Sequence, residues 1–248
     1  MNIISRTFLR LPVVLLAGFL AGCAANTPTQ EDHIYDPFEA TNREIHDFNK
    51  AVDQALLAPL SGIYGAIIPE EFQYFLGNAV TNLGQPNAFV NHVLQGDGDA
   101  AGDTLVRFVL NSTIGLAGMF DPAAEIGVFD QPTDFGETLA VWGVGEGAYI
   151  ELPLLGSSTV RDTIGMMVDF GIDPLKYALS DEQASYLFTA RVLNLLGKRH
   201  EYDDLIRALL YESADSYTAQ RLSYLQNKRH ALAGETTIDD LEDPYALE

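Results

Sequence analysis

The sequence is poor in cysteine and in basic residues. Its 248 residues include one cysteine, Cys23, so no disulfide can form within the chain. Lysine and arginine total 14 against 35 aspartates and glutamates, which gives a formal net charge of -21 at pH 7. A surface this acidic is repelled by phosphate backbones and by anionic lipid headgroups. The charge therefore argues against nucleic acid as a partner and against membrane binding through a basic face.

Apolar runs long enough to span a membrane are also missing. The run from Leu11 to Leu20 has about ten residues, against the roughly 20 that a transmembrane helix needs. It follows Arg6 and Arg10 and precedes small residues, which is the order found in a secretory signal peptide. We therefore expect residues 1–22 to be a signal peptide. With 47% hydrophobic residues, the rest of the chain can build a substantial core.

The single cysteine directly follows this segment. Leu20-Ala21-Gly22-Cys23 resembles the lipobox of bacterial lipoproteins. That resemblance implies that the Cys23 thiol carries a diacylglycerol, that the chain is cut before Cys23, and that the new amine is N-acylated. The alternative is an ordinary buried thiol behind a simple secretory signal. Because Cys23 has no partner within the exported chain, we expect lipid modification, and several acyl chains hold a protein on a membrane durably.

Composition divides the mature chain into three parts. Residues 23–34 are mostly polar and are expected to be a tether after the lipidated cysteine. Residues 35–233 carry the helical patterns and are expected to form one domain. Residues 234–248 are rich in acids and are expected to be disordered.

The first predicted helix runs from Asp36 to about Leu57. Asp36-Pro37-Phe38-Glu39 has a capping residue, a proline at the first helical position and an acid three residues after the cap. An apolar stripe at spacings of three and four residues is expected to face the core, and it consists of Ile45, Phe48, Val52 and Leu56.

Similar patterns predict further helices over 70–83, 86–94, 99–111 and about 215–232, and Asp97 to Asp99 is interpreted as a helix cap rather than a calcium loop. Ser180 to Gln183 is a capping box, opening a helix that we expect to end at Gly197. No stretch alternates as a strand does, and 141–155 is expected to be a loop. The predicted fold class is therefore all-α.

Residues for catalysis or metal binding are not apparent. The five histidines have no metal-ligand spacing and are expected at the surface or at helix caps. Gly156-Ser157-Ser158 lacks the frame of a nucleophile elbow, and Ser158 is expected to cap the helix with Arg161 and Asp162. We therefore predict no enzymatic activity, no metal and no cofactor other than the acyl chains.

Three glycines alternate in an apolar segment. Gly143, Gly145 and Gly147 lie beside Trp142 and give the segment a flexible base, which suits a lid or gate. Tight turns without mobility are an equally good interpretation.

Several sequence blocks, in one order, resemble the MlaA (VacJ) lipoprotein family of Gram-negative outer membranes. They cover most of the mature chain and consist of Asp36-Pro37-Phe38-Glu39, Asn42-Arg43, Phe48-Asn49, Asn78, Pro86, Asn91 to Gly96, Arg107-Phe108, Asn111, Gly115, Phe135 to Leu139, Trp142 to Gly147, Tyr149, Leu152-Pro153 and Gly156 to Asp162. Ala148 and Ser157 depart from the family, which usually has proline there.

The resemblance implies a ring of helices that lies in the inner leaflet of the outer membrane around an amphipathic central channel. It further implies removal of misplaced phospholipid from the outer leaflet, association with a porin trimer, and delivery to a soluble periplasmic carrier. Ala24 after the acylated position fits outer-membrane sorting, on the periplasmic side. Phe48, Asn49, Gly143, Gly145 and Gly147 are candidate channel or gate residues.

Physical chemistry agrees with such a path. Bringing a phospholipid with roughly 30 chain methylenes into water costs on the order of 20 kcal/mol, so transfer needs a continuous apolar route. The charged headgroup needs a polar side to the same route. Two alternatives stay open: a structural envelope lipoprotein or porin scaffold without lipid transport, and a lipid-modifying hydrolase.

Overall fold

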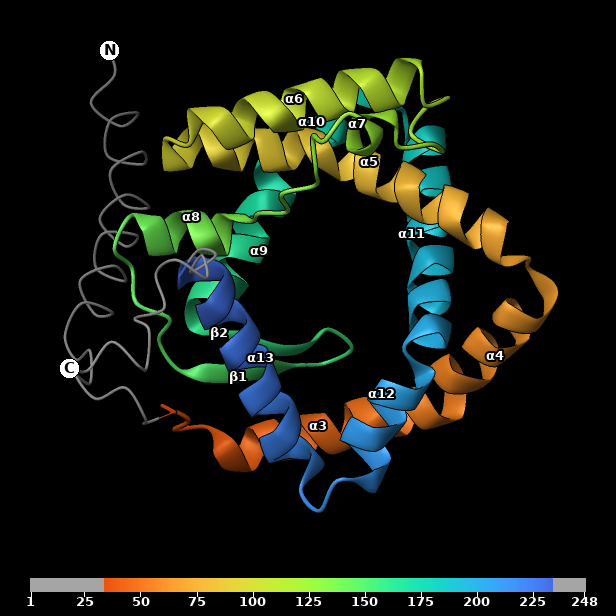
Figure 1. The fold of residues 1–248 in the computed structure, drawn as a ribbon. Helices are drawn as coiled ribbons and strands as arrows, with labels where there is room; N and C mark the ends of the chain where they lie inside the picture. Colours follow the sequence, from red (N-terminus) through yellow and green to blue (C-terminus); the bar gives the residue numbers. More distant parts are fainter. Residues whose placement is uncertain (1–33, 234–248) are drawn as a thin grey trace, which may run out of the picture.

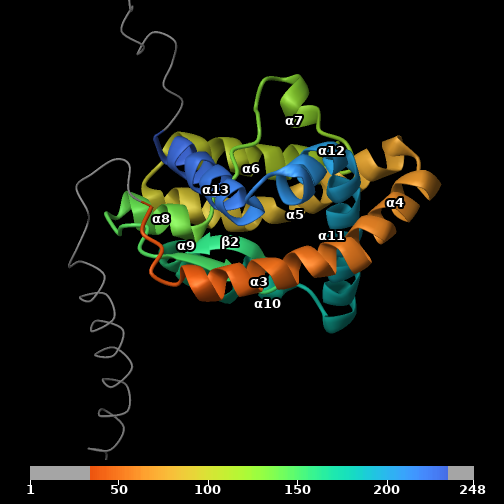
Figure 2. The same cartoon turned by 90° about the horizontal axis from the view of Figure 1, so that it is seen from below.

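The computed structural model describes residues 34–233. The predicted signal peptide, Cys23 and the acidic tail lie outside the described residues. The described helices form a ring around a central opening, with one short hairpin as its β-structure (Figure 1). Seen from the side, the ring is a flat body from which α7 (Pro122–Glu125) projects on one face (Figure 2). The prediction of an all-α fold is confirmed.

The first arm of the ring is longer than predicted. It consists of α3 (Glu39–Val52), the π-helical turn η1 (Asp53–Leu57) and α4 (Ala58–Ile67). The expected end near Leu57 is wrong because the chain passes through the π turn and continues as α4. Pro59 stands in the first turn of α4, where its missing N–H is tolerated.

Asp36 does not cap this arm, contrary to the sequence pattern. Phe38 precedes the first helical residue and makes no side-chain cap bond. The Asp36 carboxylate instead accepts hydrogen bonds from Asn42, Tyr217 and Arg221. Because two of these donors belong to the C-terminal helix, Asp36 joins the two ends of the described chain.

The second side of the ring is a pair of neighbouring helices, α5 (Glu70–Gln95) and α6 (Gly98–Thr113). The two helices predicted over 70–83 and 86–94 are one helix, since Pro86 lies inside α5 without ending it. A proline costs one backbone hydrogen bond, and packing along α6 offsets that cost. The cap prediction before α6 is confirmed, because Asp97 accepts from the Ala100 N–H at 2.9 Å.

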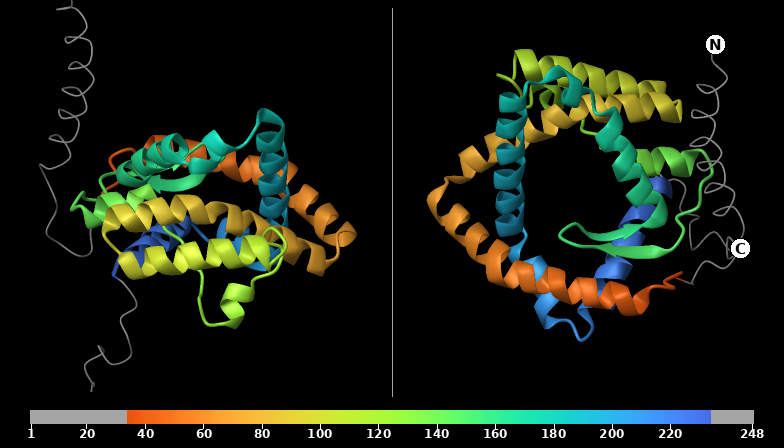
Figure 3. Two further views of the ribbon diagram at one scale, coloured as in Figure 1. Left: turned by 90° about the horizontal axis from the view of Figure 1, so that it is seen from above. Right: turned by 180° about the vertical axis from the view of Figure 1, so that it is seen from behind.

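The segment 141–155, predicted as a loop, contains the first strand of a hairpin. After α7 (Pro122–Glu125) and α8 (Phe135–Val141), β1 (Tyr149–Leu152) pairs antiparallel with β2 (Gly156–Thr159). The sequence did not reveal these strands because Glu151, a charged residue, occupies a fully buried position of β1. The turn between the strands projects into the opening of the ring (Figures 1 and 3).

The ring is completed by α9 (Val160–Ile172), α10 (Pro174–Ala178), α11 (Asp181–Glu201), α12 (Asp203–Arg207), the π turn η2 (Ala208–Glu212) and α13 (Ser216–Ala233). The Ser180 capping box is confirmed. However, α11 continues past Gly197, where a small residue admits the side chains of Tyr64 and Gln73. Thr159, not Ser158, caps α9, because the Thr159 hydroxyl accepts the hydrogen bond from the Asp162 N–H at 3.1 Å.

No residue of the predicted apolar stripe along α3 and η1 is fully buried, contrary to the prediction. Phe48 and Leu56 are 50% and 52% exposed, whereas Asn42, His46 and Asp53 are buried. The interior of the described molecule is similarly polar, and its apolar core cluster is small, with Tyr149, Tyr217 and Leu225 at its centre. A periodic stripe identifies an apolar face, but the buried face of this arm is the polar one.

None of the described helices is, on its own, both long and apolar enough to cross a membrane. The arm Glu39–Ile67 and helix Glu70–Gln95 meet the length and composition criteria only as a pair, and that pair is bent by 117°.

Candidate functional site: a cavity inside the ring

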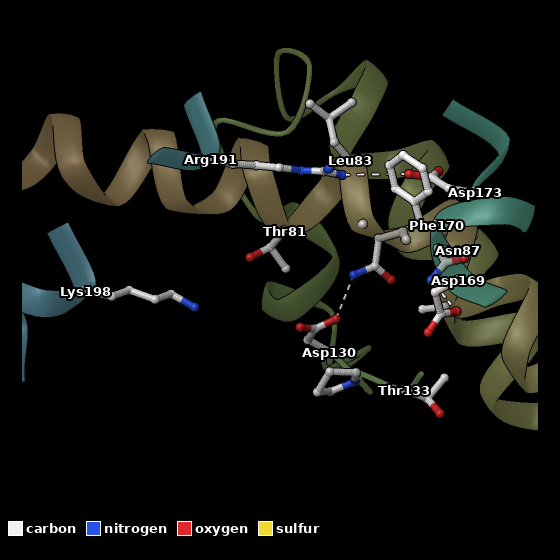
Figure 4. Close-up of a pocket in the computed structure, with 14 residues that line it drawn as sticks. Thr81, Leu83, Asn87, Asp130, Thr133, Asp169, Phe170, Asp173, Arg191 and Lys198 are labelled. Carbon is white, nitrogen blue, oxygen red and sulfur yellow. Dashed lines mark hydrogen bonds and ion pairs between the residues drawn. The ribbon is translucent and has the colours of Figure 1, made fainter. Parts of the chain in front are cut away.

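A cavity of about 540 Å³ lies between α5, α9 and α11 (Figure 4). This volume is within the range of ordinary small-ligand sites. Its lining is amphipathic and consists of Thr81, Leu83, Gly84, Gln85, Asn87, Ala88, Asp130, Pro132, Thr133, Asp169, Phe170, Asp173, Arg191 and Lys198.

One wall of the cavity is a hydrogen-bonded polar lattice. The Gln85 side-chain N–H donates to Asp130 at 2.7 Å. The Asn87 and Asn91 amides donate to the same oxygen of Asp169 at 2.9 and 2.8 Å. These bonds fix α5 to the segment before α8 and to α9, so the wall is assembled from parts of the chain that are far apart in sequence.

The opposite wall is α11, and its position depends on a buried ion pair. Arg199 donates to both oxygens of Asp53 at 2.8 and 3.0 Å, and Tyr211 donates to Asp53 at 2.7 Å. Burial together with the Asp53 carboxylate raises the pKa of Tyr211 to about 12, so its hydroxyl stays a donor. This cluster ties α11 and η2 to the first arm and closes the ring.

The hairpin is held against α3 by two asparagines. Asn42 donates to the Tyr149 carbonyl at 3.1 Å and accepts from the Glu151 N–H at 3.0 Å. Seven residues later, Asn49 donates to the Leu152 carbonyl at 2.9 Å and accepts from the Leu154 N–H at 2.7 Å. Since a side-chain amide offers both N–H donors and an acceptor oxygen, the two side chains replace a neighbouring strand along β1 and the start of the turn.

Below the hairpin, a serine, a histidine and a glutamate meet. His46 Nε2 lies 2.9 Å from Ser216 Oγ, but its Nδ1 is 3.8 Å from Glu151 Oε1, beyond hydrogen-bond reach. The Glu151 carboxylate already accepts hydrogen bonds from Tyr149 and Gln220. Burial and this carboxylate raise the pKa of Tyr149, so it remains a donor. The geometry is that of a structural network and not of a hydrolase triad.

Residues 34–231 match the family model described as MlaA lipoprotein. The chain belongs to the MlaA lipoprotein family.

Individual relatives agree with this family assignment. The Escherichia coli (strain K12) protein "Intermembrane phospholipid transport system lipoprotein MlaA" is 31% identical over 96% of this chain and 94% of that protein. The Haemophilus influenzae MlaA protein is 29% identical over 88% of this chain and 87% of its own length. An uncharacterized protein of Rickettsia bellii is 36% identical over 58% of this chain, and the match spans 57% of that relative.

A solved structure also matches the ring. It was reported as the structural basis for maintenance of bacterial outer membrane lipid asymmetry. Its TM-score is 0.67 at 28% identity, and the match covers 79% of this chain and 98% of that one.

The candidate channel residues of this MlaA family member do not line the cavity. Phe48 of α3 is half-exposed, and Asn49 is hydrogen-bonded to the hairpin. Cys23 lies outside the described residues. The cavity residues were missed because a polar residue within an apolar helix, such as Gln85 or Asn87 in α5, resembles any solvated position. Only the buried stripe of polar residues along α5 could have indicated them.

The glycine segment lies at the edge of the ring, between α8 and β1. Gly143 and Gly147 have φ values of 86° and 73°, which require glycine. Trp142 donates to the Leu94 carbonyl at 3.0 Å, and Arg229 of α13 pairs with Glu146 at 2.6 Å. Gly145 lies between these attachments. Both interpretations, a gate and a set of tight turns, stay predictions.

The prediction of surface or capping histidines is wrong for two of them. His46 and His92 are 2% and 5% exposed. His92 Nε2 lies 2.9 Å from the Gln131 carbonyl, which ties α5 to the segment that carries Asp130. In each imidazole Nε2 has a hydrogen-bond partner, whereas the buried Nδ1 has none among the described residues. His33 lies outside the described residues. Within residues 34–233, no group of three or more histidine, cysteine, aspartate or glutamate side chains is arranged to hold a metal ion.

Proposed function

We propose that this protein is a non-enzymatic phospholipid carrier of the Gram-negative outer membrane. It removes mislocalised phospholipid from the outer leaflet and passes it to a soluble periplasmic carrier, which maintains lipid asymmetry. The observation that carries this proposal is the polarity of the ring, in which many large apolar side chains are exposed, whereas the buried residues are largely polar and the cavity is amphipathic. Family membership and the name of the Escherichia coli relative support it.

The outer surface supports a position in the inner leaflet of that membrane. Large apolar side chains on several helices are more than 60% exposed, including Ile67, Phe72, Met167 and Phe188. Soluble monomers rarely expose so many large apolar side chains, since apolar surface costs about 25 cal/mol per Å² in water. A ring that sits in one leaflet needs no spanning helix.

The anchor is proposed to be the acylated Cys23, with diacylglycerol on the thiol and an acyl chain on the amine. The variant Cys23→Ser tests it by fractionation. We expect the variant to be lost from the outer membrane or to be only weakly attached. A variant that still pelleted with membranes after a salt wash would contradict the anchor.

Transport is tested by two measurements in the source organism, one on a deletion strain and one on the complemented strain. Deletion of the gene is expected to increase phospholipid at the cell surface, and protein purified from the complemented strain is expected to carry bound phospholipid. An unchanged outer leaflet and no bound lipid would favour a porin scaffold or other structural lipoprotein. Copurification of an outer-membrane porin trimer tests the proposed porin partner in either case.

The hydrolase alternative has its own test. In a Ser-His-Glu triad built from the described residues, Ser216 would be the nucleophile beside His46. The variant Ser216→Ala removes its hydroxyl. We expect no lyso-lipid or free fatty acid when the purified protein is incubated with phospholipid, and unchanged complementation by Ser216→Ala. Release of fatty acid by the parent protein, lost in this variant, would overturn the non-enzymatic assignment.

A further inference from the structure

The two walls of the cavity carry opposite charges (Figure 4). Asp130, Asp169 and Asp173 stand on the side of α5 and α9, whereas Arg191 and Lys198 come from α11. A site with one polarity on each side suits a ligand that carries both charges, and a zwitterionic headgroup is such a ligand.

The acidic wall keeps much of its negative charge. Asp169 accepts hydrogen bonds from Asn87, Asn91 and the Phe135 N–H, all of them neutral donors. Among the described contacts, Asp130 and Asp173 each have one cation within 4.0 Å, Arg107 at 3.8 Å and Arg191 at 3.9 Å, and both distances are too long for a hydrogen bond. Neutral donors leave a carboxylate its charge, so this wall attracts a cation.

The same wall also has unused hydrogen-bond acceptors. Gln85 is 3% exposed, and its side-chain oxygen has no partner among the described residues. The Asn87 side-chain oxygen is also buried without a hydrogen-bond partner among the described residues. Their N–H groups are committed to Asp130 and Asp169, so flipping the amides does not satisfy the oxygens. An unmade hydrogen bond at a buried acceptor is costly, which favours a ligand that brings N–H donors.

The basic wall suits a phosphate. Lys198 is exposed and extends from α11 toward the cavity in Figure 4. In the described part of the chain, Lys198 makes no ion pair within 4.0 Å. Arg191 lies 3.9 Å from Asp173, a distance too long for a hydrogen bond. Lysine and arginine are the usual partners of phosphate oxygens in proteins.

We propose that the cavity selects phospholipids with a phosphoethanolamine headgroup. The ammonium lies at the wall of Asp130 and Asp173 and donates toward Gln85 and Asn87, and the phosphate lies at Lys198 and Arg191. A phosphoglycerol headgroup brings the phosphate without a cation, and a phosphocholine headgroup brings a cation without an N–H donor. The inference rests on the proposed function and adds the lipid class.

The test is a competition for the purified full-length lipoprotein in detergent. It is incubated with an equimolar mixture of dioleoyl phosphatidylethanolamine, phosphatidylglycerol and phosphatidylcholine, and bound lipid is measured by mass spectrometry. We expect phosphatidylethanolamine to be enriched about tenfold over each competitor, the ratio that a modest binding difference produces.

Variants of the two walls sharpen the test. Asp130→Asn keeps an acceptor oxygen for Gln85, and Asp173→Asn keeps one for the α10 cap. Each variant is expected to lower the ratio of bound phosphatidylethanolamine to bound phosphatidylglycerol toward one. Lys198→Gln is expected to lower bound lipid of all three classes without changing their ratio. Asp99→Asn, at an exposed position outside the cavity lining, is the charge-matched control and is expected to change nothing.

Failure of the inference is distinguishable from failure of transport. Equal binding of the three lipids, or a ratio that Asp130→Asn and Asp173→Asn leave unchanged while both variants keep the parent's thermal midpoint, would overturn the headgroup preference and leave the proposed function standing. Binding of none of the three lipids would overturn both.

Discussion

Asn49 Oδ1 accepts a 2.7 Å hydrogen bond from the Leu154 N–H, and this bond holds the hairpin turn inside the ring. The Leu154 side chain is 68% exposed, so side-chain packing adds little to the hold. The position of the turn therefore depends on the amide of a residue about a hundred positions earlier in the chain.

Replacing this amide should free the turn. Asn49→Ala removes both the bond to Leu154 and the bond to the Leu152 carbonyl, a loss of about 1–3 kcal/mol of local stability. We expect amide hydrogen exchange at residues 152–155 to speed up tenfold or more, with the helices unchanged. Gln54→Ala, at an exposed position of η1, is the control. Unchanged exchange in Asn49→Ala would show that other contacts hold the turn.

The closure of the ring depends on a second pair. Arg199→Met leaves Asp53 buried without its cation, which costs about 3–5 kcal/mol. We expect the midpoint of unfolding in detergent to fall by several degrees, with α11 the first helix to lose exchange protection. Arg207→Met, at an exposed arginine of α12, should leave the midpoint in place. Equal unfolding midpoints for Arg199→Met and Arg207→Met would show that the ion pair of Arg199 and Asp53 does not hold the ring closed.

Close packing of α8 against α9 gives a third prediction. A Cβ at Gly165 would lie 2.3 Å from the Gly136 backbone nitrogen, so Gly165→Ala forces the two helices apart. We expect a loss of several kcal/mol, since main-chain atoms cannot move aside as a side chain does. Gly171→Ala in the same helix meets nothing within 4 Å and should be neutral or slightly stabilising. Chemical unfolding compares the two, and equal stabilities would contradict the packing argument.

The connection to α7 should respond to acid. Burial alone raises the pKa of Asp121, but hydrogen bonds from Arg107 and Asn111 outweigh burial and hold the pKa below its ordinary 3.8. A carboxyl group with a lowered folded pKa stabilises the fold fully above its unfolded value and loses this contribution as the pH falls through the folded value. We expect exchange protection of 121–126 to fall below about pH 4.

The variant Asp121→Asn provides the control for this acid response. It cannot ionise, so it should show the weaker protection already at neutral pH and little change below it. A parent protein and variant with the same pH profile would contradict the assignment of the response to Asp121.

Local signals in the sequence predicted the helices well where a cap is self-contained. The Ser180 box and the Asp97 cap lie within four residues of the bonds they make, so the sequence alone was enough. Asp36 has the same pattern, but its carboxylate accepts hydrogen bonds from Tyr217 and Arg221, which are distant in sequence. A cap motif does not reveal such competing partners.

The polarity of the interior could not be predicted from periodicity. Phe48 and Leu56 form the expected stripe, yet the side with His46 and Asp53 is the buried one. A periodic pattern separates two faces of a helix but does not state whether water or lipid surrounds the protein. The cavity could not be predicted from the sequence for a related reason, because Gln85, Asp169 and Lys198 meet only in the folded ring.

The central claim is that phospholipid passes through the cavity. Thr81→Trp places a large ring in that space, since Thr81 lines it, whereas Thr41→Trp makes the same change at an exposed site of α3. The most direct test is surface phospholipid in a deletion strain that expresses either variant at equal level. We predict that Thr41→Trp restores the parental level and that Thr81→Trp leaves surface phospholipid as high as in the deletion. Full restoration by a folded Thr81→Trp protein would contradict the account.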